Sequence, residues 1–154
     1  MAIAVGNKAP NFTLPSQSGT NITLSQFLGK SPVVVYFYPK DDTPGCTMEA
    51  CQFRDEYQAF QDAGAVVIGI SSDSVASHQS FVDKHNLPFV LLSDVKNEAR
   101  NAFGVPNTLW VMPGRVTYVI DKEGVVKSIF NNMLDAKAHV SEALKTIEGL
   151  TTVA

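Results

Sequence analysis

Unbroken apolar runs alternate with polar, turn-rich stretches along the chain. Residues 32–38 and 65–70 are continuous β-branched and aromatic segments, a pattern typical of strands buried on both faces of a sheet. Between them, aromatic residues recur at spacings of four and three and predict one amphipathic helix over residues 43–63. Gly64 follows directly, as glycine often does at a helix end. The pattern of this region is therefore strand, helix, strand.

Shorter segments complete the pattern. Proline and glycine punctuate the first 30 residues and favour a small hairpin of 11–14 with 21–24. A β-α-β half followed by a β-β-α half is the layout of the α/β thioredoxin-like fold, a mixed central sheet flanked by helices on both faces. We expect residues 1–154 to form this fold as a single domain, with the hairpin at its N-terminus. The remaining predicted elements are a helix over 74–84, a strand over 89–92, a helix over 96–103, strands over 115–120 and 125–130 joined by a tight turn, and a last helix over 135–148.

Composition and charge exclude several classes of protein. Hydrophobic residues make up 45% of the chain, enough for a substantial core, and the net charge of −3 gives no sign of the basic surface that nucleic-acid binding requires. The N-terminus lacks the charged and apolar regions of a signal peptide, and no apolar window reaches the roughly 18 residues of a membrane span. We therefore expect a cytoplasmic protein of a reducing compartment, and the sequence leaves open the mature form of an organelle protein.

Two cysteines five positions apart are the only thiols of the chain. The first, Cys46, follows the strand 32–38 after a Thr-Pro-Gly corner. Thr43 is a good N-cap and Pro44 suits the first helical position, so Cys46 falls in the first turn of a helix. Free backbone N–H groups and the positive end of the helix dipole lie there, and both favour a thiolate over a thiol. This placement predicts a reactive Cys46; the alternative is a small buried hydrophobic residue.

The second cysteine, Cys51, lies on the same predicted helix as Cys46. Ideal helix geometry separates their Cα atoms by about 8.6 Å, whereas a disulfide needs about 7 Å or less. If the two form a bond, the first turns of the helix must unwind. Other chemistry fits the pair less well. No second cysteine pair or His-x3-His accompanies it for zinc, Gln52 stands where a cysteine phosphatase has its arginine, and thioredoxin-like reductases use Cys-x-x-Cys.

One distant residue fits the same site. Arg115 begins the predicted strand 115–120, inside an otherwise apolar element. If that strand pairs antiparallel with 32–38, Arg115 lies beside Cys46 in space although the two are far apart in sequence. A guanidinium there would hold the thiolate and bind a polar oxygen substrate. The alternative is a surface arginine at a strand end.

A sequence motif connects these residues to a known family. The segment Pro39-Lys40-Asp41-Asp42-Thr43-Pro44-Gly45-Cys46 matches the Pro-x-x-x-Thr-x-x-Cys motif of the peroxiredoxins. Together with Tyr38, Thr47 and Cys51, it resembles the bacterioferritin-comigratory protein / peroxiredoxin Q subfamily. The resemblance covers roughly residues 5–148. Further segments similar to that subfamily are 87–94, 103–106, 113–121 and 129–132, of which the last resembles plant and cyanobacterial members.

The resemblance implies a thiol-specific peroxidase that reduces hydrogen peroxide and organic hydroperoxides. Cys46 is then the peroxidatic cysteine, which attacks the O–O bond and becomes a sulfenic acid. Thr43, Arg115 and the backbone N–H of Cys46 position the peroxide and stabilise the transition state, and Pro39 shields the site. Cys51 resolves the sulfenic acid as an intramolecular disulfide, which thioredoxin or a glutaredoxin-type reductant then reduces.

Several expectations accompany these roles. The resemblance places Glu49, as an acidic residue near the arginine, among the substrate-binding residues; an exposed helix glutamate is the alternative. It implies no metal, haem, flavin or other cofactor, and it leans toward a monomer from a bacterial, including cyanobacterial, cytoplasm or, in mature form, a chloroplast. The competing function is a non-enzymatic redox sensor or holdase, in which a Cys46–Cys51 disulfide unwinds the helix and exposes apolar surface.

Other polar and apolar residues have simpler explanations. The three histidines lie on predicted helices without metal-ligand spacing, which predicts solvated or capping side chains. Residues 40–42 are expected to form a solvated loop at the mouth of the site. Residues 109–112 are expected in a long loop, either as ordinary apolar packing or as a rim for organic peroxides or thioredoxin. The histidines are His78, His85 and His139.

Overall fold

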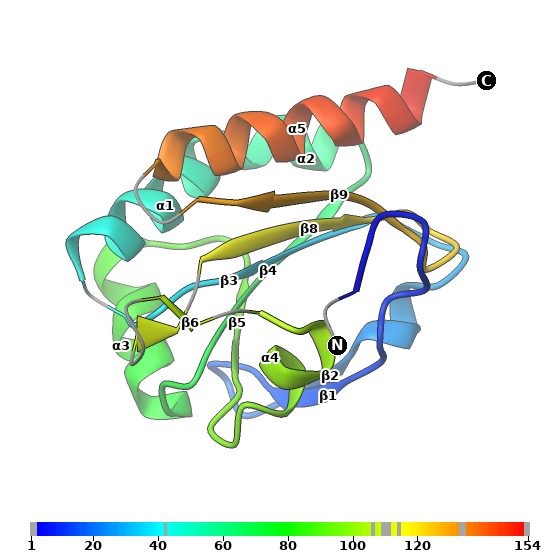
Figure 1. The fold of residues 1–154 in the computed structure, drawn as a ribbon. Helices are drawn as coiled ribbons and strands as arrows, with labels where there is room; N and C mark the ends of the chain where they lie inside the picture. The colour runs from blue at the N-terminus through cyan, green and yellow to red at the C-terminus, as the bar shows by residue number, and fades with distance from the viewer. Residues whose placement is uncertain are drawn as a thin grey trace.

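A mixed five-stranded sheet forms the centre of the molecule in the described residues (Figure 1). The computed structural model describes residues 3–41, 43–105, 107–108, 112–113, 115–132 and 135–152. The strand order is β5-β4-β3-β8-β9, in which the first three strands are parallel and the last two antiparallel to their neighbours. The strands are β3 (Val33–Phe37), β4 (Val66–Ser71), β5 (Val90–Ser93), β8 (Val116–Ile120) and β9 (Val126–Asn131).

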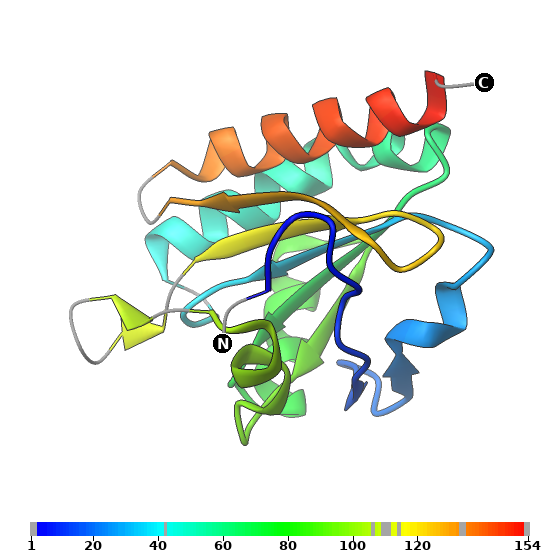
Figure 2. The same cartoon turned by 45° about the vertical axis from the view of Figure 1, so that its right-hand side comes forward.

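Helices cover both faces of this sheet (Figures 1 and 2). The steps from β3 to β4 and from β4 to β5 move in the same direction across the sheet, so right-handed crossovers place their connecting helices on one face. That face packs against α1 (Pro44–Asp55), α2 (Tyr57–Asp62), α3 (Val75–His85) and α5 (Ala136–Thr152). The other face carries α4 (Glu98–Phe103), the hairpin of β1 (Thr13–Pro15) with β2 (Asn21–Thr23), and the 3-10 helix η1 (Leu24–Phe27).

The position of the central strand β3 explains why its sequence is apolar throughout. Val34 and Tyr36 belong to the core on the α1 side, whereas Val33, Val35 and Phe37 belong to the core on the α4 side. Every residue of the strand is buried, because side chains alternate between two covered faces. The strand therefore contributes to both layers, and its C-terminal end leads directly into the cysteine segment.

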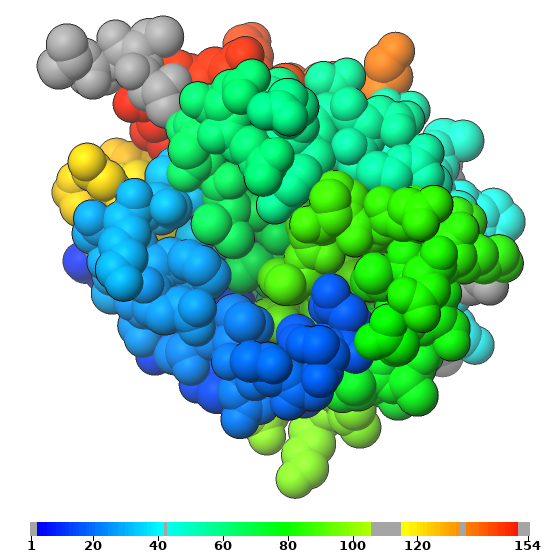
Figure 3. Space-filling view, turned by 180° about the vertical axis from the view of Figure 1, so that it is seen from behind, coloured from blue at the N-terminus to red at the C-terminus, as the bar shows by residue number. Residues whose placement is uncertain are grey.

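The N-terminal hairpin is tied to the far edge of the sheet. The amide of Gln17 donates to the carbonyl of Leu91 at 3.1 Å, and Ser16 forms a bridge with Leu92 of β5. In Figure 3 the blue N-terminal segment lies against the green residues of this edge. Covering the edge strand in this way blocks pairing with another chain. In the described residues, no helix is long and apolar enough to cross a membrane.

The predicted α/β thioredoxin-like architecture, with a mixed sheet and an N-terminal hairpin, is confirmed. The single helix expected over 43–63 is wrong, because the backbone leaves helical geometry at Glu56, where ψ is 4°, and α2 begins anew. A break of one residue leaves the apolar stripe nearly in phase, so the hydrophobic pattern gave no sign of it. The expected loop before Arg115 contains two short paired strands, β6 (Asn107–Thr108) and β7 (Met112–Pro113). Residues 109–111 lie outside the described residues.

Candidate active site

The site lies at the edge of the sheet where β3 ends and β8 begins. These two strands are antiparallel, with Phe37 opposite Val116. Arg115, which directly precedes Val116, is therefore brought to the end of β3, where the chain turns toward α1. Strand pairing thus brings Arg115 close to Cys46, although the two are far apart in sequence. The antiparallel pairing predicted from the sequence is confirmed.

Cys46 occupies the first turn of α1 and is 1% exposed. Thr43 is the N-cap residue, and the amide of Thr47 donates to its carbonyl at 2.8 Å. The amides of Gly45 and Cys46 precede this first helical hydrogen bond and stay outside the helical ladder. The sulfur therefore lies at the positive end of the helix, an environment that favours a thiolate.

The hydroxyl of Thr43 does not cap the helix, although Thr43 occupies the predicted N-cap position. It makes no capping hydrogen bond to the helix and instead donates to the carbonyl of Lys40 at 2.9 Å. Because its hydrogen is used in this way, the oxygen of Thr43 presents lone pairs that can accept a hydrogen bond from a substrate. Thr43 is half-buried and Pro39 is buried, so both lie within the wall of the site.

Arg115 joins the sulfur to an acidic residue. Its Nη2 donates to Cys46 Sγ at 3.3 Å, and its Nη1 donates to Glu49 Oε1 at 2.6 Å and to the carbonyl of Gly45 at 3.4 Å. The side chain is 4% exposed, so the alternative of a surface arginine is wrong. Burial lowers the pKa of Arg115, but Glu49 and Cys46 more than compensate, and the net pKa is raised. The guanidinium is therefore a permanent cation against the sulfur.

Glu49 is fully buried, so the alternative of an exposed helix glutamate is wrong. Burial raises the pKa of Glu49 to about 7, although the guanidinium of Arg115 opposes this shift. Its second oxygen, Oε2, has no hydrogen-bond partner among the described residues and lies 3.6 Å from Nδ1 of His139. The buried carboxyl group of Glu49 therefore holds Arg115 in place. Because its pKa is about 7, it gains or loses a proton near neutral pH.

His139 of α5 lies behind Glu49 and is also fully buried. Its Nε2 donates to the carbonyl of Asn132 at 2.5 Å, which leaves Nδ1 of a neutral ring to accept from the hydroxyl of Thr117 at 2.8 Å. Burial lowers the pKa of His139 to about 4. The solvated or capping role expected for His139 is therefore wrong. The ring can be buried because it is neutral and both of its nitrogens have hydrogen-bond partners.

The two buried groups predict opposite pH dependences of stability. The folded-state pKa of Glu49 is above its ordinary 4.5, so its stabilising contribution is lost as pH rises from about 4.5 through 7. The folded-state pKa of His139 is below its ordinary 6.5, so its contribution is lost as pH falls from 6.5 through about 4. A Glu49→Gln variant should therefore gain free energy of unfolding relative to wild type, by at most about 3 kcal/mol, between pH 4.5 and 7. Urea unfolding at several pH values measures this difference. If the free energy of unfolding depends on pH in the same way in both proteins, the prediction is contradicted.

Because Gly45 has no side chain, the guanidinium of Arg115 can lie close to the backbone there. A Cβ at this position would lie 2.9 Å from Arg115 Nη2, and the guanidinium is already held by Glu49. Gly45→Ala is expected to shift the guanidinium away from the sulfur and to slow the peroxide reaction that the sequence motif predicts for Cys46 by about 10- to 100-fold. Competition with a reference peroxidase measures the rate constant. An unchanged rate would show that the contact between Arg115 and the sulfur contributes little.

Cys51 is half-buried in the C-terminal half of α1, and both thiols are free. Its Sγ lies 4.0 Å from Nδ1 of His85, a residue expected to be solvated or capping but half-buried against the helix. Because α1 is continuous through both cysteines, helix geometry keeps their Cα atoms too far apart for a disulfide in this conformation.

A second buried arginine at the site was not predicted from the sequence. Arg100 of α4 is 4% exposed, and its Nη2 donates to the carbonyl of Tyr38 at 3.0 Å. Its guanidinium also lies over the ring of Phe37, 5.5 Å from the centroid. Arg100 therefore holds the residue before Pro39. A lone arginine on a short predicted helix carries no sequence signal for this contact.

Comparison with known proteins agrees with this geometry. The AhpC/TSA family model matches residues 5–129. Peroxiredoxin Q, chloroplastic, of Triticum aestivum is 53% identical over 149 residues, which are 96% of this chain and 68% of that protein. The corresponding protein of Sedum lineare is 52% identical over 96% of this chain and 80% of its own length.

Solved structures give the same result. The peroxidoxin BcpB of Mycobacterium tuberculosis superposes with a TM-score of 0.89 at 36% identity, covering 96% of this chain and 98% of that one. The bacterioferritin comigratory protein of Xanthomonas campestris superposes with a TM-score of 0.84 at 32% identity over 92% of each chain. The chain therefore belongs to the AhpC/TSA family and, within it, to the peroxiredoxin Q or bacterioferritin-comigratory group of thiol peroxidases.

Proposed function

We propose that the protein reduces hydrogen peroxide and organic hydroperoxides at Cys46, that Cys51 resolves the oxidised sulfur, and that a thioredoxin- or glutaredoxin-type protein restores both thiols. The observation that carries this proposal is the 3.3 Å contact between Arg115 Nη2 and Cys46 Sγ at a helix N-terminus. A cation contacts the sulfur there, in the first turn of a helix, which is the environment that a thiolate nucleophile needs.

In the first step, the Cys46 thiolate attacks one oxygen of the peroxide and the O–O bond breaks. The departing oxygen leaves with the bonding pair and takes up a proton as water or an alcohol, while Cys46 becomes a sulfenic acid. Negative charge develops on the peroxide oxygens, where Arg115 and the free amides of the first turn donate hydrogen bonds. The hydroxyl of Thr43 accepts from the protonated peroxide oxygen, and Pro39 excludes water.

In the second step, Cys51 attacks the sulfenic sulfur. An S–S bond forms, the S–O bond breaks, and the hydroxyl leaves as water with the proton of Cys51. The intact helix prevents this approach, so the first turns of α1 must unwind. A dithiol reductant then cleaves the disulfide by exchange.

Replacing Cys51 should separate the two steps. Cys51→Ser is expected to consume about one equivalent of peroxide at the wild-type rate and then to stall, because the sulfenic acid of Cys46 has no partner thiol. Rapid mixing with peroxide, followed by trapping of sulfenic acid with a dimedone probe, measures this step. Normal recycling of the variant by thioredoxin would exclude Cys51 as the resolving residue.

The rate of turnover distinguishes an enzyme from a redox sensor. With thioredoxin, thioredoxin reductase and NADPH present, an enzyme oxidises many equivalents of NADPH for each protein molecule, whereas a sensor reacts about once. We expect sustained peroxide-dependent NADPH oxidation by the wild-type protein acting as a monomer. Stoichiometric oxidation in the presence of both thioredoxin and glutaredoxin systems would overturn the proposed function.

A further inference from the structure

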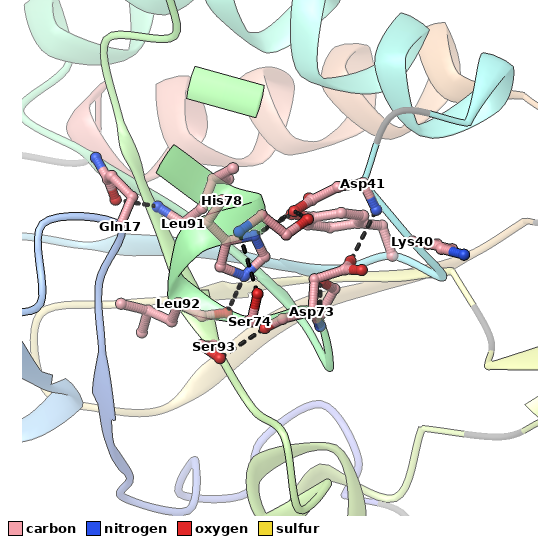
Figure 4. A network of polar contacts seen from close by, with 12 residues as sticks. Gln17, Lys40, Asp41, Asp73, Ser74, His78, Leu91, Leu92 and Ser93 are labelled. Carbon is pink, nitrogen blue, oxygen red and sulfur yellow. Dashed lines mark hydrogen bonds and ion pairs between the residues drawn. The ribbon is translucent and has the colours of Figure 1, made fainter. Parts of the chain in front are cut away.

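The loop between Pro39 and Thr43 contains a buried carboxylate that the proposed reaction does not use. Asp41 is 6% exposed, so the expectation of a solvated loop is wrong at this residue; Asp42 lies outside the described residues. Oδ1 of Asp41 accepts from the hydroxyl of Tyr38 at 2.5 Å, and Oδ2 accepts from Ser77 Oγ at 2.9 Å. Oδ2 also lies 2.6 Å from Nδ1 of His78, which is fully buried on α3 (Figure 4). The carboxylate thus joins the cysteine loop to another helix.

Both ring nitrogens of His78 have hydrogen-bond partners. Its Nδ1 lies against the carboxyl group of Asp41, and its Nε2 lies 2.9 Å from the carbonyl of Leu92 on β5. His78 and Asp41 therefore form a buried hydrogen-bonded pair whose polar atoms are satisfied. The solvated or capping role expected for His78 is wrong.

The backbone of the same loop has a second attachment. The amide of Asp41 donates to Asp73 Oδ2 at 2.8 Å, and that oxygen also accepts from Ser71 Oγ at 2.6 Å. Ser71 and Asp73 lie at or just after the C-terminal end of β4, beside the end of β3. Asp41, Asp73 and His78 are close enough to hold a cation, but their polar atoms already form hydrogen bonds with one another and with Ser71 and Ser77.

We propose that the Asp41–His78 pair positions the peroxidatic helix and sets how readily it unwinds. Asp41 lies two residues from both Pro39 and Thr43, and Thr43 is tied back to Lys40. Holding Asp41 against α3 and β5 keeps Thr43 and the first turn of α1 around the sulfur. The same attachment opposes the local unfolding that brings Cys46 to Cys51. This inference rests on the proposed function.

The pair should therefore act on the two steps in opposite directions. When the loop is released from α3, the first turn of α1 spends less time in the folded arrangement in which Cys46 attacks peroxide. It spends more time in the unwound arrangement in which Cys46 can reach Cys51. The sulfenic acid of Cys46 either reacts with Cys51 or takes an oxygen from a second peroxide, which becomes water or an alcohol, to form a sulfinic acid. Easier unwinding favours the first outcome and protects the enzyme from overoxidation.

His78→Phe tests this inference because it keeps a ring of similar size and removes both ring nitrogens. We expect its reaction with peroxide to be about 10-fold slower, disulfide formation to be several-fold faster, and the peroxide concentration that gives half sulfinic acid to rise several-fold. Quenched mixing with thiol alkylation and mass spectrometry measures all three quantities. His78→Asn, which keeps one donor toward Asp41, should lie between wild type and His78→Phe.

Two controls separate positioning from general instability. Val126→Ala removes buried core volume at the opposite end of the sheet, where Val126 pairs with Ile120, and should lower the unfolding midpoint without changing the sulfinic-acid threshold. If His78→Phe does not fold, Ser77→Ala removes one hydrogen bond to Asp41 and should give the same changes at smaller size. Slowing of both steps together, or an unchanged threshold, would overturn the inference. A wild-type protein that does not reduce peroxide would instead refute the proposed function.

Discussion

A Cys46→Ser variant is expected to lose peroxide-dependent oxidation of thioredoxin, with a fall on the order of 10⁴-fold or more to the uncatalysed background. A serine hydroxyl at this position is not ionised at neutral pH, so neither Arg115 nor the helix end has an anion to stabilise. The substitution replaces sulfur by a smaller oxygen atom and should leave the fold intact. A coupled assay with NADPH measures the loss.

Cys51→Ser is the matched control, because it removes the other thiol of the same helix. It should still show the first peroxide-consuming event, whereas Cys46→Ser should show none. Circular dichroism establishes that both variants are folded. Peroxide consumption that survives in Cys46→Ser and disappears in Cys51→Ser would exchange the roles of the two cysteines.

Arg115→Met should produce the second large effect. It removes the guanidinium that contacts Cys46, and the peroxide rate constant should fall on the order of 10²- to 10³-fold. Glu49 then remains buried without its partner, so its pKa should rise further and the free energy of unfolding should fall by about 3 kcal/mol above pH 7. Stopped-flow kinetics and urea unfolding measure the two effects separately.

A double variant distinguishes catalysis from stability at this pair. Arg115→Met with Glu49→Gln removes both buried charges, so most of the lost stability should return while the peroxide reaction stays slow. Arg54→Met serves as a control. Arg54 lies on α1, as Glu49 does, but its side chain is 34% exposed and pairs with Asp55. Recovery of the rate in the double variant would assign the role of Arg115 to folding alone.

The parts of the site that follow from strand pairing could be predicted from sequence. The segment 32–38 is apolar on both faces, and antiparallel pairing with the strand after Arg115 is enough to place the guanidinium near Cys46. The helix start at Thr43 and Pro44 could also be predicted, because capping preferences are local. The use of the Thr43 hydroxyl could not, since the carbonyl of Lys40 competes for it within the loop.

Buried polar pairs that involve helix residues could not be predicted, because no strand pairing links the two partners, which are distant in sequence. Glu49 and Arg115 are 66 residues apart, and Asp41 and His78 are 37 apart. A glutamate or histidine on an amphipathic helix gives no local sign that it will be covered. The family resemblance implied that Glu49 is a site residue, but the burial of His78 and His139 depends on how α3 and α5 pack against the sheet.

The proposed cycle requires that one peroxide oxidise Cys46 and that Cys51 then close an intramolecular disulfide. Reduced wild-type protein should be treated with one equivalent of peroxide, alkylated, and digested without reductant by a protease that cleaves after Glu49, which lies between the two cysteines. We predict a loss of two hydrogens and two peptides joined through Cys46 and Cys51. Recovery of Cys46 as an alkylated thiol, with oxidation confined to other residues, would refute this cycle.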